Sequence, residues 1–133
     1  MMLNIGTFAF ATRPRIYISG PISGKPNGNK EAFSAMEDKL FAMGFDVENP
    51  RRSAWPAYLS LENPTQFKEG WALMMREAMQ QQSRCDALVL LPGWQKSKGA
   101  CIEYQIALVC GQPCFSADLQ LITDGPEKLL ETP

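Results

Sequence analysis

Residues 86–111 read DALVLLPGWQKSKGACIEYQIALVCG and are expected to form a strand, a loop and a helix in that order. Residues 86–91 are continuously apolar after the first position, which is typical of a central parallel strand buried on both faces. The helix is expected to begin near Gly99 and to end at Gly111, because glycine commonly follows the last turn of a helix. A strand that leads through a short loop into a helix is the repeating unit of α/β folds, so this stretch decides the fold class.

One acidic residue, Glu103, lies within the apolar face of that helix. Helical spacing places it among five other residues, which are Ile102, Ile106, Ala107, Val109 and Cys110. An unpaired carboxylate costs several kcal/mol to bury, so Glu103 needs either a partner or a chemical task. A structural salt bridge and a catalytic role are both open for this residue.

Strand and helix patterns alternate along the rest of the chain. Strands are expected at residues 15–19, 45–50, 112–116 and 119–122, and helices at residues 30–43 and 65–83. With residues 86–91 they predict an α/β three-layer sandwich, in which helices cover both faces of a five-stranded parallel sheet. Residues 51–65 are expected to form a long loop and residues 126–130 a short terminal helix. We expect residues 1–14 to be a loose N-terminal extension and residues 15–133 to be a single domain.

The composition of the chain argues against several classes of function. The chain has 133 residues, 45% of them hydrophobic, and a formal net charge of −1, which gives no reason to expect a nucleic-acid polymer or an anionic membrane as partner. No apolar run is long enough to span a bilayer. The mildly apolar segment from Leu3 to Ala11 lacks the cationic part of a signal peptide, so a cytoplasmic location is expected.

Histidine is absent from the chain, and the four cysteines form no CxxC pair. The first fact excludes a Ser-His-Asp triad, a Cys-His dyad and histidine-rich metal sites, and the second gives no sign of a zinc knuckle. We therefore expect neither a metal nor a cofactor. Proton transfer falls to carboxylates, Tyr, Lys, Cys or water.

Ligands of parallel α/β sheets bind beyond the carboxyl ends of the strands. Three predicted loops collect at that edge, at residues 20–29, 49–65 and 92–98. Ser97, Gly99 and the first N–H groups of the Glu103 helix form an arrangement suited to an anion. The loop at residues 19–24 adds hydroxyl groups and backbone donors. The helix N-terminus is also expected to keep Glu103 ionised.

Four segments resemble the nucleoside 2-deoxyribosyltransferase superfamily. They are residues 17–24 (YISGPISG), residues 85–94 (CDALVLLPGW), the spacing Ser97-x-Gly99-x-x-x-Glu103, and residues 111–113 (GQP). The chain looks most like an uncharacterised, often phage-borne branch with an LLPGW…SxGAxxE motif. The resemblance covers residues 15–116.

That resemblance implies a flavodoxin-like or Rossmann-like fold and an enzyme, either a nucleoside deoxyribosyltransferase or a deoxynucleoside 5′-monophosphate N-glycosidase. Glu103 matches the nucleophile that forms a glycosyl-enzyme intermediate, and Asp86 matches a second acidic residue of the catalytic site. The ribose and base end is matched by Tyr17, Ser19, Gly20, Pro21 and Gly24, and the place of a 5′-phosphate by Ser97 and Gly99. A homo-oligomer, a dimer or larger, is implied as well.

Other interpretations stay open. Asp86 begins its strand, so a helix cap or a structural bond is as good an explanation as catalysis. Trp94 either stacks on a nucleobase or plugs the edge of the sheet. For the whole protein, the alternatives are a non-catalytic nucleotide-binding sensor and a glycohydrolase that acts on NAD or ADP-ribose.

Overall fold

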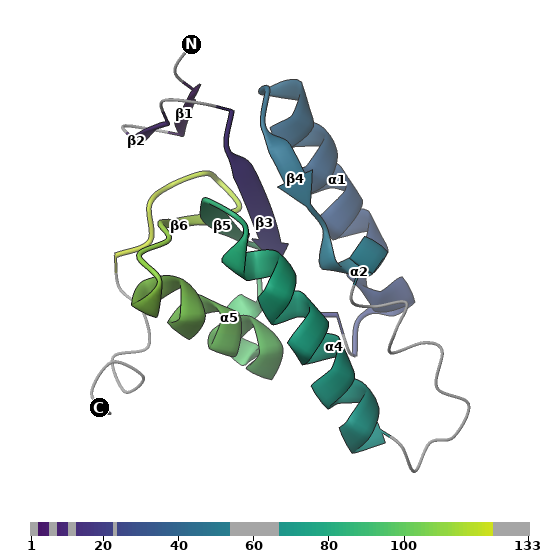
Figure 1. The fold of residues 1–133 in the computed structure, drawn as a ribbon. Helices are drawn as coiled ribbons and strands as arrows, with labels where there is room; N and C mark the ends of the chain where they lie inside the picture. The colour runs from purple at the N-terminus through teal and green to yellow at the C-terminus, as the bar shows by residue number, and fades with distance from the viewer. Residues whose placement is uncertain (1–2, 6–7, 11–12, 23, 54–66, 124–133) are drawn as a thin grey trace.

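The computed structural model describes residues 3–5, 8–10, 13–22, 24–53 and 67–123. Within these residues a four-stranded parallel sheet has the strand order β4-β3-β5-β6. Its strands are β3 (Arg15–Ser19), β4 (Asp46–Glu48), β5 (Ala87–Leu90) and β6 (Cys114–Ser116). Because every pairing is parallel, the carboxyl ends of all four strands meet at one edge (Figure 1).

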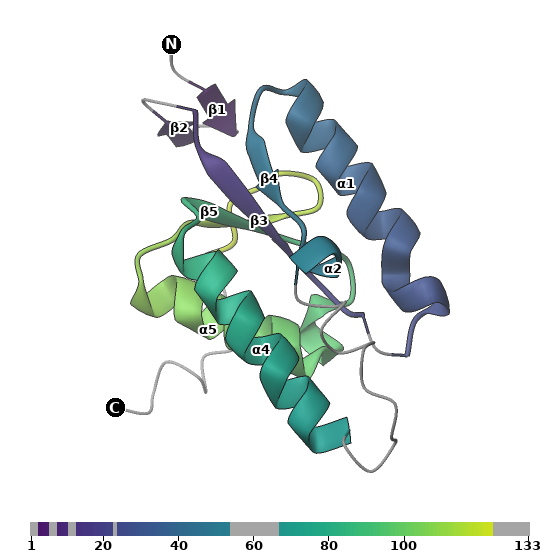
Figure 2. The ribbon, with the colours of Figure 1, turned by 45° about the vertical axis from the view of Figure 1, so that its right-hand side comes forward.

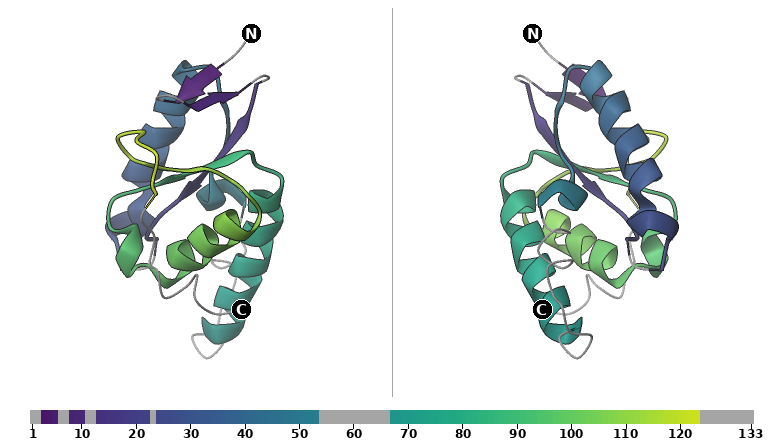
Figure 3. Two further views of the ribbon diagram at one scale, coloured as in Figure 1. Left: turned by 90° about the vertical axis from the view of Figure 1, so that its left-hand side faces the viewer. Right: turned by 90° about the vertical axis from the view of Figure 1, so that its right-hand side faces the viewer.

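Helices cover both faces of this sheet, as the sequence predicts. Helix α1 (Lys30–Ala42) lies on one face, and α4 (Phe67–Ser83) and α5 (Lys98–Val109) lie on the other (Figure 2). Three short elements join them, which are η1 (Pro26–Asn29), α2 (Pro50–Ser53) and η3 (Trp94–Lys96). The protein is therefore an α/β sandwich of three layers, and the two outer layers are visible edge-on in Figure 3.

Two hydrophobic clusters, one on each face, hold the layers together. In β3, Ile16 and Ile18 pack into the cluster that contains Phe33 and Leu40 of α1. The intervening Tyr17 belongs to the cluster on the other face, with residues of α4 and α5. Alternation of this kind follows from the two-residue period of a strand, and it turns Tyr17 toward the α4 and α5 side.

The prediction of a fifth parallel strand at residues 119–122 is wrong. Residues 119–122 turn back on β6, where Phe115 and Leu121 form an isolated antiparallel bridge. The amide of Leu119 donates to the carbonyl of Ser116 at 2.8 Å, which closes a tight turn. A parallel neighbour needs a crossover of about a dozen residues or more, and the turn between the two runs is far shorter than that.

The expected N-terminal extension contains a two-stranded antiparallel sheet of β1 (Leu3–Ile5) and β2 (Phe8–Phe10). Ile5 is buried in the cluster on the α1 face. Phe10 meets Phe45 edge to face, with ring centroids 6.2 Å apart. The predicted terminal helix at residues 126–130 and most of the predicted loop at residues 51–65 lie outside the described residues.

Candidate functional site

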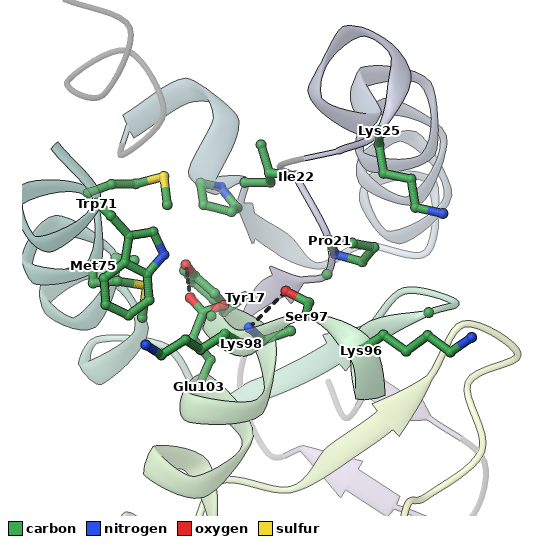
Figure 4. Close-up of a pocket in the computed structure, with 17 residues that line it drawn as sticks. Tyr17, Pro21, Ile22, Lys25, Trp71, Met75, Lys96, Ser97, Lys98 and Glu103 are labelled. Carbon is green, nitrogen blue, oxygen red and sulfur yellow. Dashed lines mark hydrogen bonds between the residues drawn. The ribbon is translucent and has the colours of Figure 1, made fainter. Parts of the chain in front are cut away.

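A cavity of about 560 Å³ opens at the carboxyl edge of the sheet (Figure 4). Its walls come from the end of β3 and the following loop, from the middle of α4, and from η3 with the first two turns of α5. The volume falls within the range of about 300–1,000 Å³ that is usual for small-molecule sites. This is the edge at which parallel α/β sheets bind ligands, so the cavity is the candidate site.

Glu103 forms part of the cavity wall and is only 6% exposed. Both of its carboxylate oxygens accept hydrogen bonds from β3. The hydroxyl of Ser19 donates to Oε1 at 2.8 Å, and the phenol of Tyr17 donates to Oε2. Among the described residues, no lysine or arginine forms an ion pair with this carboxylate. The salt-bridge explanation is thus replaced by a carboxylate held by two hydroxyl groups.

Burial dominates the electrostatics of this carboxylate. Desolvation raises the pKa of Glu103 from its usual 4.5 to about 7, while the hydrogen bonds from Tyr17 and Ser19 act in the opposite direction. The helix N-terminus is expected from the sequence to keep Glu103 ionised, but burial raises the pKa of the carboxyl group instead. Glu103 lies in the second turn of α5, where the effect of the helix dipole has declined and burial outweighs it.

Tyr17 stays protonated beside this carboxylate. Burial first, and the negative charge of Glu103 second, raise the pKa of its phenol well above the usual value. A protonated phenol donates a hydrogen bond to either state of the carboxyl group. Near neutral pH, Glu103 exchanges between the acid and the carboxylate while its two donors remain in place.

Of the predicted binding residues, Tyr17, Gly20, Pro21, Ser97 and Gly99 line the cavity. The Ser97 hydroxyl caps α5 by accepting a hydrogen bond from the amide of Ala100 at 3.2 Å, which leaves its own proton free for a further acceptor. Gly20 is required by close packing, because a Cβ there would lie 2.8 Å from the Cβ of Leu91.

Of the residues predicted for the ribose and base end, Ser19 and Gly24 stand apart from the cavity wall. Ser19 is completely buried and acts on the site through its bond to Glu103. Gly24 is exposed and is not among the residues that line the cavity.

Asp86 is not brought to the site. It is exposed and directly precedes β5, so it lies at the amino edge of the sheet. One of its carboxylate oxygens accepts a hydrogen bond from the amide of Arg15 at 2.8 Å, which ties the starts of two strands together. The structural bond is therefore the correct interpretation of this residue, because the length of β5 separates it from the carboxyl edge.

Trp94 fills the edge of the sheet, which is one of the two interpretations that the sequence leaves open. It is 6% exposed and packs against Tyr104, with ring centroids 5.0 Å apart. The tryptophan that does line the cavity is Trp71 of α4. The sequence pattern indicates only an apolar helix face there, and no local signal separates a core position from a cavity wall.

The rim of the cavity carries three lysines, which are Lys25, Lys96 and Lys98. The ammonium of Lys98 lies 4.9 Å from the centroid of the Trp71 ring, a cation–π contact. In Figure 4, Trp71 and Lys98 stand at one end of the cavity, Lys25 and Lys96 stand at the other, and Glu103 lies between them. The predicted anion arrangement at Ser97 thus has lysine neighbours that the motif does not contain.

The described residues contain no group of three acidic or cysteine side chains placed to hold a metal ion. In the same part of the chain, no helix combines the length and the apolar character needed to cross a bilayer.

A comparison with protein families gives one match. The family model is described as a domain of unknown function, DUF4406, and it matches residues 14–115, more than half of the chain. The matched range includes Tyr17, Ser19 and Glu103. No curated protein matches the chain.

Proposed function

We propose that this chain, which belongs to the DUF4406 family, cleaves or transfers at the N-glycosidic bond of a nucleoside or nucleoside 5′-monophosphate, with Glu103 as the nucleophile. The observation that carries the proposal is a buried carboxylate in the wall of a cavity at the ligand-binding edge of the sheet, held by two hydroxyl donors and by no cation among the described residues. The resemblance to the nucleoside 2-deoxyribosyltransferase superfamily supports the same assignment.

A reaction at the anomeric carbon of the sugar needs a nucleophile, and Glu103 can supply one. The ionised carboxylate of Glu103 attacks C1′ through an oxocarbenium-like transition state, and a glycosyl ester forms. The C1′–N bond breaks, and its electron pair leaves with the base, which takes a proton from water. Water or a second, free nucleobase then attacks C1′ and loses a proton to solvent. The C1′–O bond to Glu103 breaks, and the carboxylate is released. Tyr17 and Ser19 hold the carboxylate and compensate part of its negative charge before attack.

The two ends of the cavity fit the two ends of a nucleotide. With the sugar over Glu103, the base extends toward the face of Trp71, and the 5′-phosphate extends toward Ser97 and Lys96. The phosphate there meets the N-terminus of α5 and the positive rim, both of which favour an anion. We therefore expect nucleoside 5′-monophosphates to be better substrates than free nucleosides.

The test is release of free base from a panel of deoxynucleosides, their 5′-monophosphates and NAD, followed by chromatography. We expect turnover with at least one monophosphate and its loss in Glu103→Gln. Activity in the variant equal to that of the wild type would contradict the role of Glu103. Tight nucleotide binding without any turnover would instead support a sensor, and release of nicotinamide would support a glycohydrolase acting on NAD.

The preference for a phosphate is tested by Lys96→Met, with Lys39→Met on the outer face of α1 as a matched control. We expect the KM for the monophosphate to rise about tenfold in the first variant, because one charge-assisted contact is lost, and the KM for the nucleoside to stay unchanged. An equal change for both substrates would argue against a phosphate at this end of the cavity.

A further inference from the structure

Two buried glutamines form an amide pair beside the backbone of Glu103. Gln82, near the end of α4, is fully buried and donates from Nε2 to the backbone carbonyl of Glu103 at 2.7 Å. The same nitrogen lies 3.3 Å from Oε1 of Gln112. Gln112 in turn donates from its Nε2 to the carbonyls of Gln82 and Cys85, each at 2.8 Å.

The backbone places Gln112 for this task. Helix α5 ends at Val109 and is followed by the cap residue Cys110 and then by Gly111, which has a φ of +70°. The amide of Gln112 then donates to the carbonyl of Ala107 at 2.8 Å. This arrangement is a Schellman cap, in which the residue after the glycine turns back along the helix. The side chain of Gln112 therefore reaches from the end of α5 to the end of α4, and Gln82 reaches back to the second turn of α5.

The need to fill space in the core does not explain why two polar side chains lie here. Oε1 of Gln82 is buried and has no hydrogen-bond partner among the described residues, a loss that costs free energy. An apolar side chain of similar size would avoid that cost and would still fill the space. What it would lose is the one side-chain donor that the structure gives to the backbone carbonyl of Glu103.

We propose that Gln82, held by Gln112, is a positioning residue that fixes the backbone of Glu103 and so keeps the carboxylate in register with Tyr17 and Ser19. Its catalytic consequence rests on the proposed function, and its geometric consequence does not. Loss of the Gln82 donor lets α5 shift against β3, and the two hydrogen bonds to the carboxylate lengthen. Those bonds lower the pKa of Glu103, so their weakening raises it.

The geometric consequence is measured by titrating protein that carries ¹³C at the glutamate carboxyl carbons, with the Glu103 resonance assigned by its absence in Glu103→Gln. We expect Gln82→Met to move the midpoint of Glu103 upward by about 0.5–1 pH unit, a part of the value of a hydrogen bond to a charged group. The other titratable groups around the site are unaltered, namely the cavity lysines Lys25, Lys96 and Lys98, and Glu48 and the neutral thiol of Cys85, which act on Tyr17.

Two controls separate positioning from loss of stability. Gln81→Met makes the same exchange one position away, where the side chain bonds to Glu77 within α4. Met36→Ala destabilises the core on the α1 face without touching the site. Both are expected to leave the Glu103 midpoint unchanged, even where the melting temperature falls. If Gln82→Met fails to fold, Gln112→Met breaks the same pair from the other side and is expected to give the same upward shift.

The catalytic consequence is a fall in kcat of about tenfold or more with KM within about twofold, since the substrate still fits a nucleophile that is slightly displaced. An unchanged Glu103 midpoint in folded Gln82→Met overturns the proposal, as does an equal shift in Met36→Ala. Absence of turnover in the wild type would contradict the proposed function only, because the titration still reports on the glutamine pair.

Discussion

Each of the two edges of the parallel sheet presents a carboxylate that the family resemblance implies to be catalytic, and only one of them lies in a buried, cavity-lining setting. Glu103 at the carboxyl edge is buried, has two hydroxyl donors and faces a cavity. Asp86 at the amino edge is exposed and accepts a bond from a backbone amide. Burial and the choice of partner, more than the type of residue, distinguish a reactive group from a structural one.

The surroundings of the two edges differ in the same sense. The cavity around Glu103 has an apolar wall from α4 and a rim of three lysines. A second hollow runs from the starts of β3 and β4 along β4 and α1, and its acidic side chains include Glu37, Asp46 and Glu48. There Asp46 pairs with Arg13 at 3.0 Å, and both side chains are about half exposed. Exposed pairs of that kind contribute about 0–1 kcal/mol to the free energy of unfolding, so the ion pair at the amino edge has only a small effect on stability.

The largest expected difference between the edges is in turnover. Glu103→Gln is expected to lower kcat with the best nucleotide substrate by at least about 1,000-fold, because the variant has no nucleophile. Asp86→Asn, the matched exchange at the other edge, is expected to stay within about twofold of the wild type. Base release is measured for both variants under one set of conditions. A lower kcat in Asp86→Asn than in Glu103→Gln would contradict the comparison.

The next largest effect concerns Tyr17, the donor on β3 that bonds to Glu103 of α5. Tyr17→Phe removes the hydrogen bond to Oε2 of Glu103 and leaves the ring packing in place. A hydrogen bond to a charged group contributes about 1.5–3 kcal/mol, so we expect kcat to fall about 10–100-fold. Because that bond lowers the pKa of Glu103, the acid limb of the pH–rate profile should also move to higher pH. A variant with the profile of the wild type would show that Tyr17 does not tune the carboxylate.

A third prediction concerns stability. Burial raises the pKa of Glu103 from 4.5 to about 7, so the folded protein binds this proton more tightly than the unfolded chain. The free energy of unfolding therefore falls as pH rises from about 4.5 to 7, by about 3 kcal/mol from this group. Glu103→Gln lacks the titrating group and should lack this part of the fall. Urea unfolding of both proteins at pH 5 and pH 8 measures the difference, and parallel curves would contradict the burial argument.

The smallest expected effect belongs to the amino edge. Asp86→Asn weakens one exposed bond to the amide of Arg15, so the free energy of unfolding should fall by about 1 kcal/mol or less. Urea unfolding at pH 7 gives this value. A loss of several kcal/mol would mean that the bond between the starts of β3 and β5 matters more to the fold than its exposure indicates.

The pattern along the chain predicts the layers of the fold, because two-residue and helical periods are local properties. It predicts the burial of Glu103 but not the correct helix face, because Val109 and Cys110 are exposed and the buried face of α5 consists of Ala100, Glu103, Tyr104 and Ala107. It does not predict the partners of that carboxylate, since Tyr17 lies 86 residues away and meets it only through the packing of β3 against α5. The burial of Trp94 and the position of Trp71 in the cavity wall have the same origin, since both depend on how distant elements pack together. The missing fifth strand reflects a turn too short for a crossover, a constraint of length that strand propensity ignores.

The central claim is that Glu103 forms a covalent bond to the sugar. A 2′-fluoro nucleoside 5′-monophosphate slows release of the sugar from such an ester, so intact-protein mass spectrometry after incubation is the direct measurement. We predict a mass increase equal to one fluorinated sugar phosphate, located on Glu103 by peptide mapping and absent from Glu103→Gln. Base release by the wild type without an adduct, or with an adduct on another residue, would contradict the account.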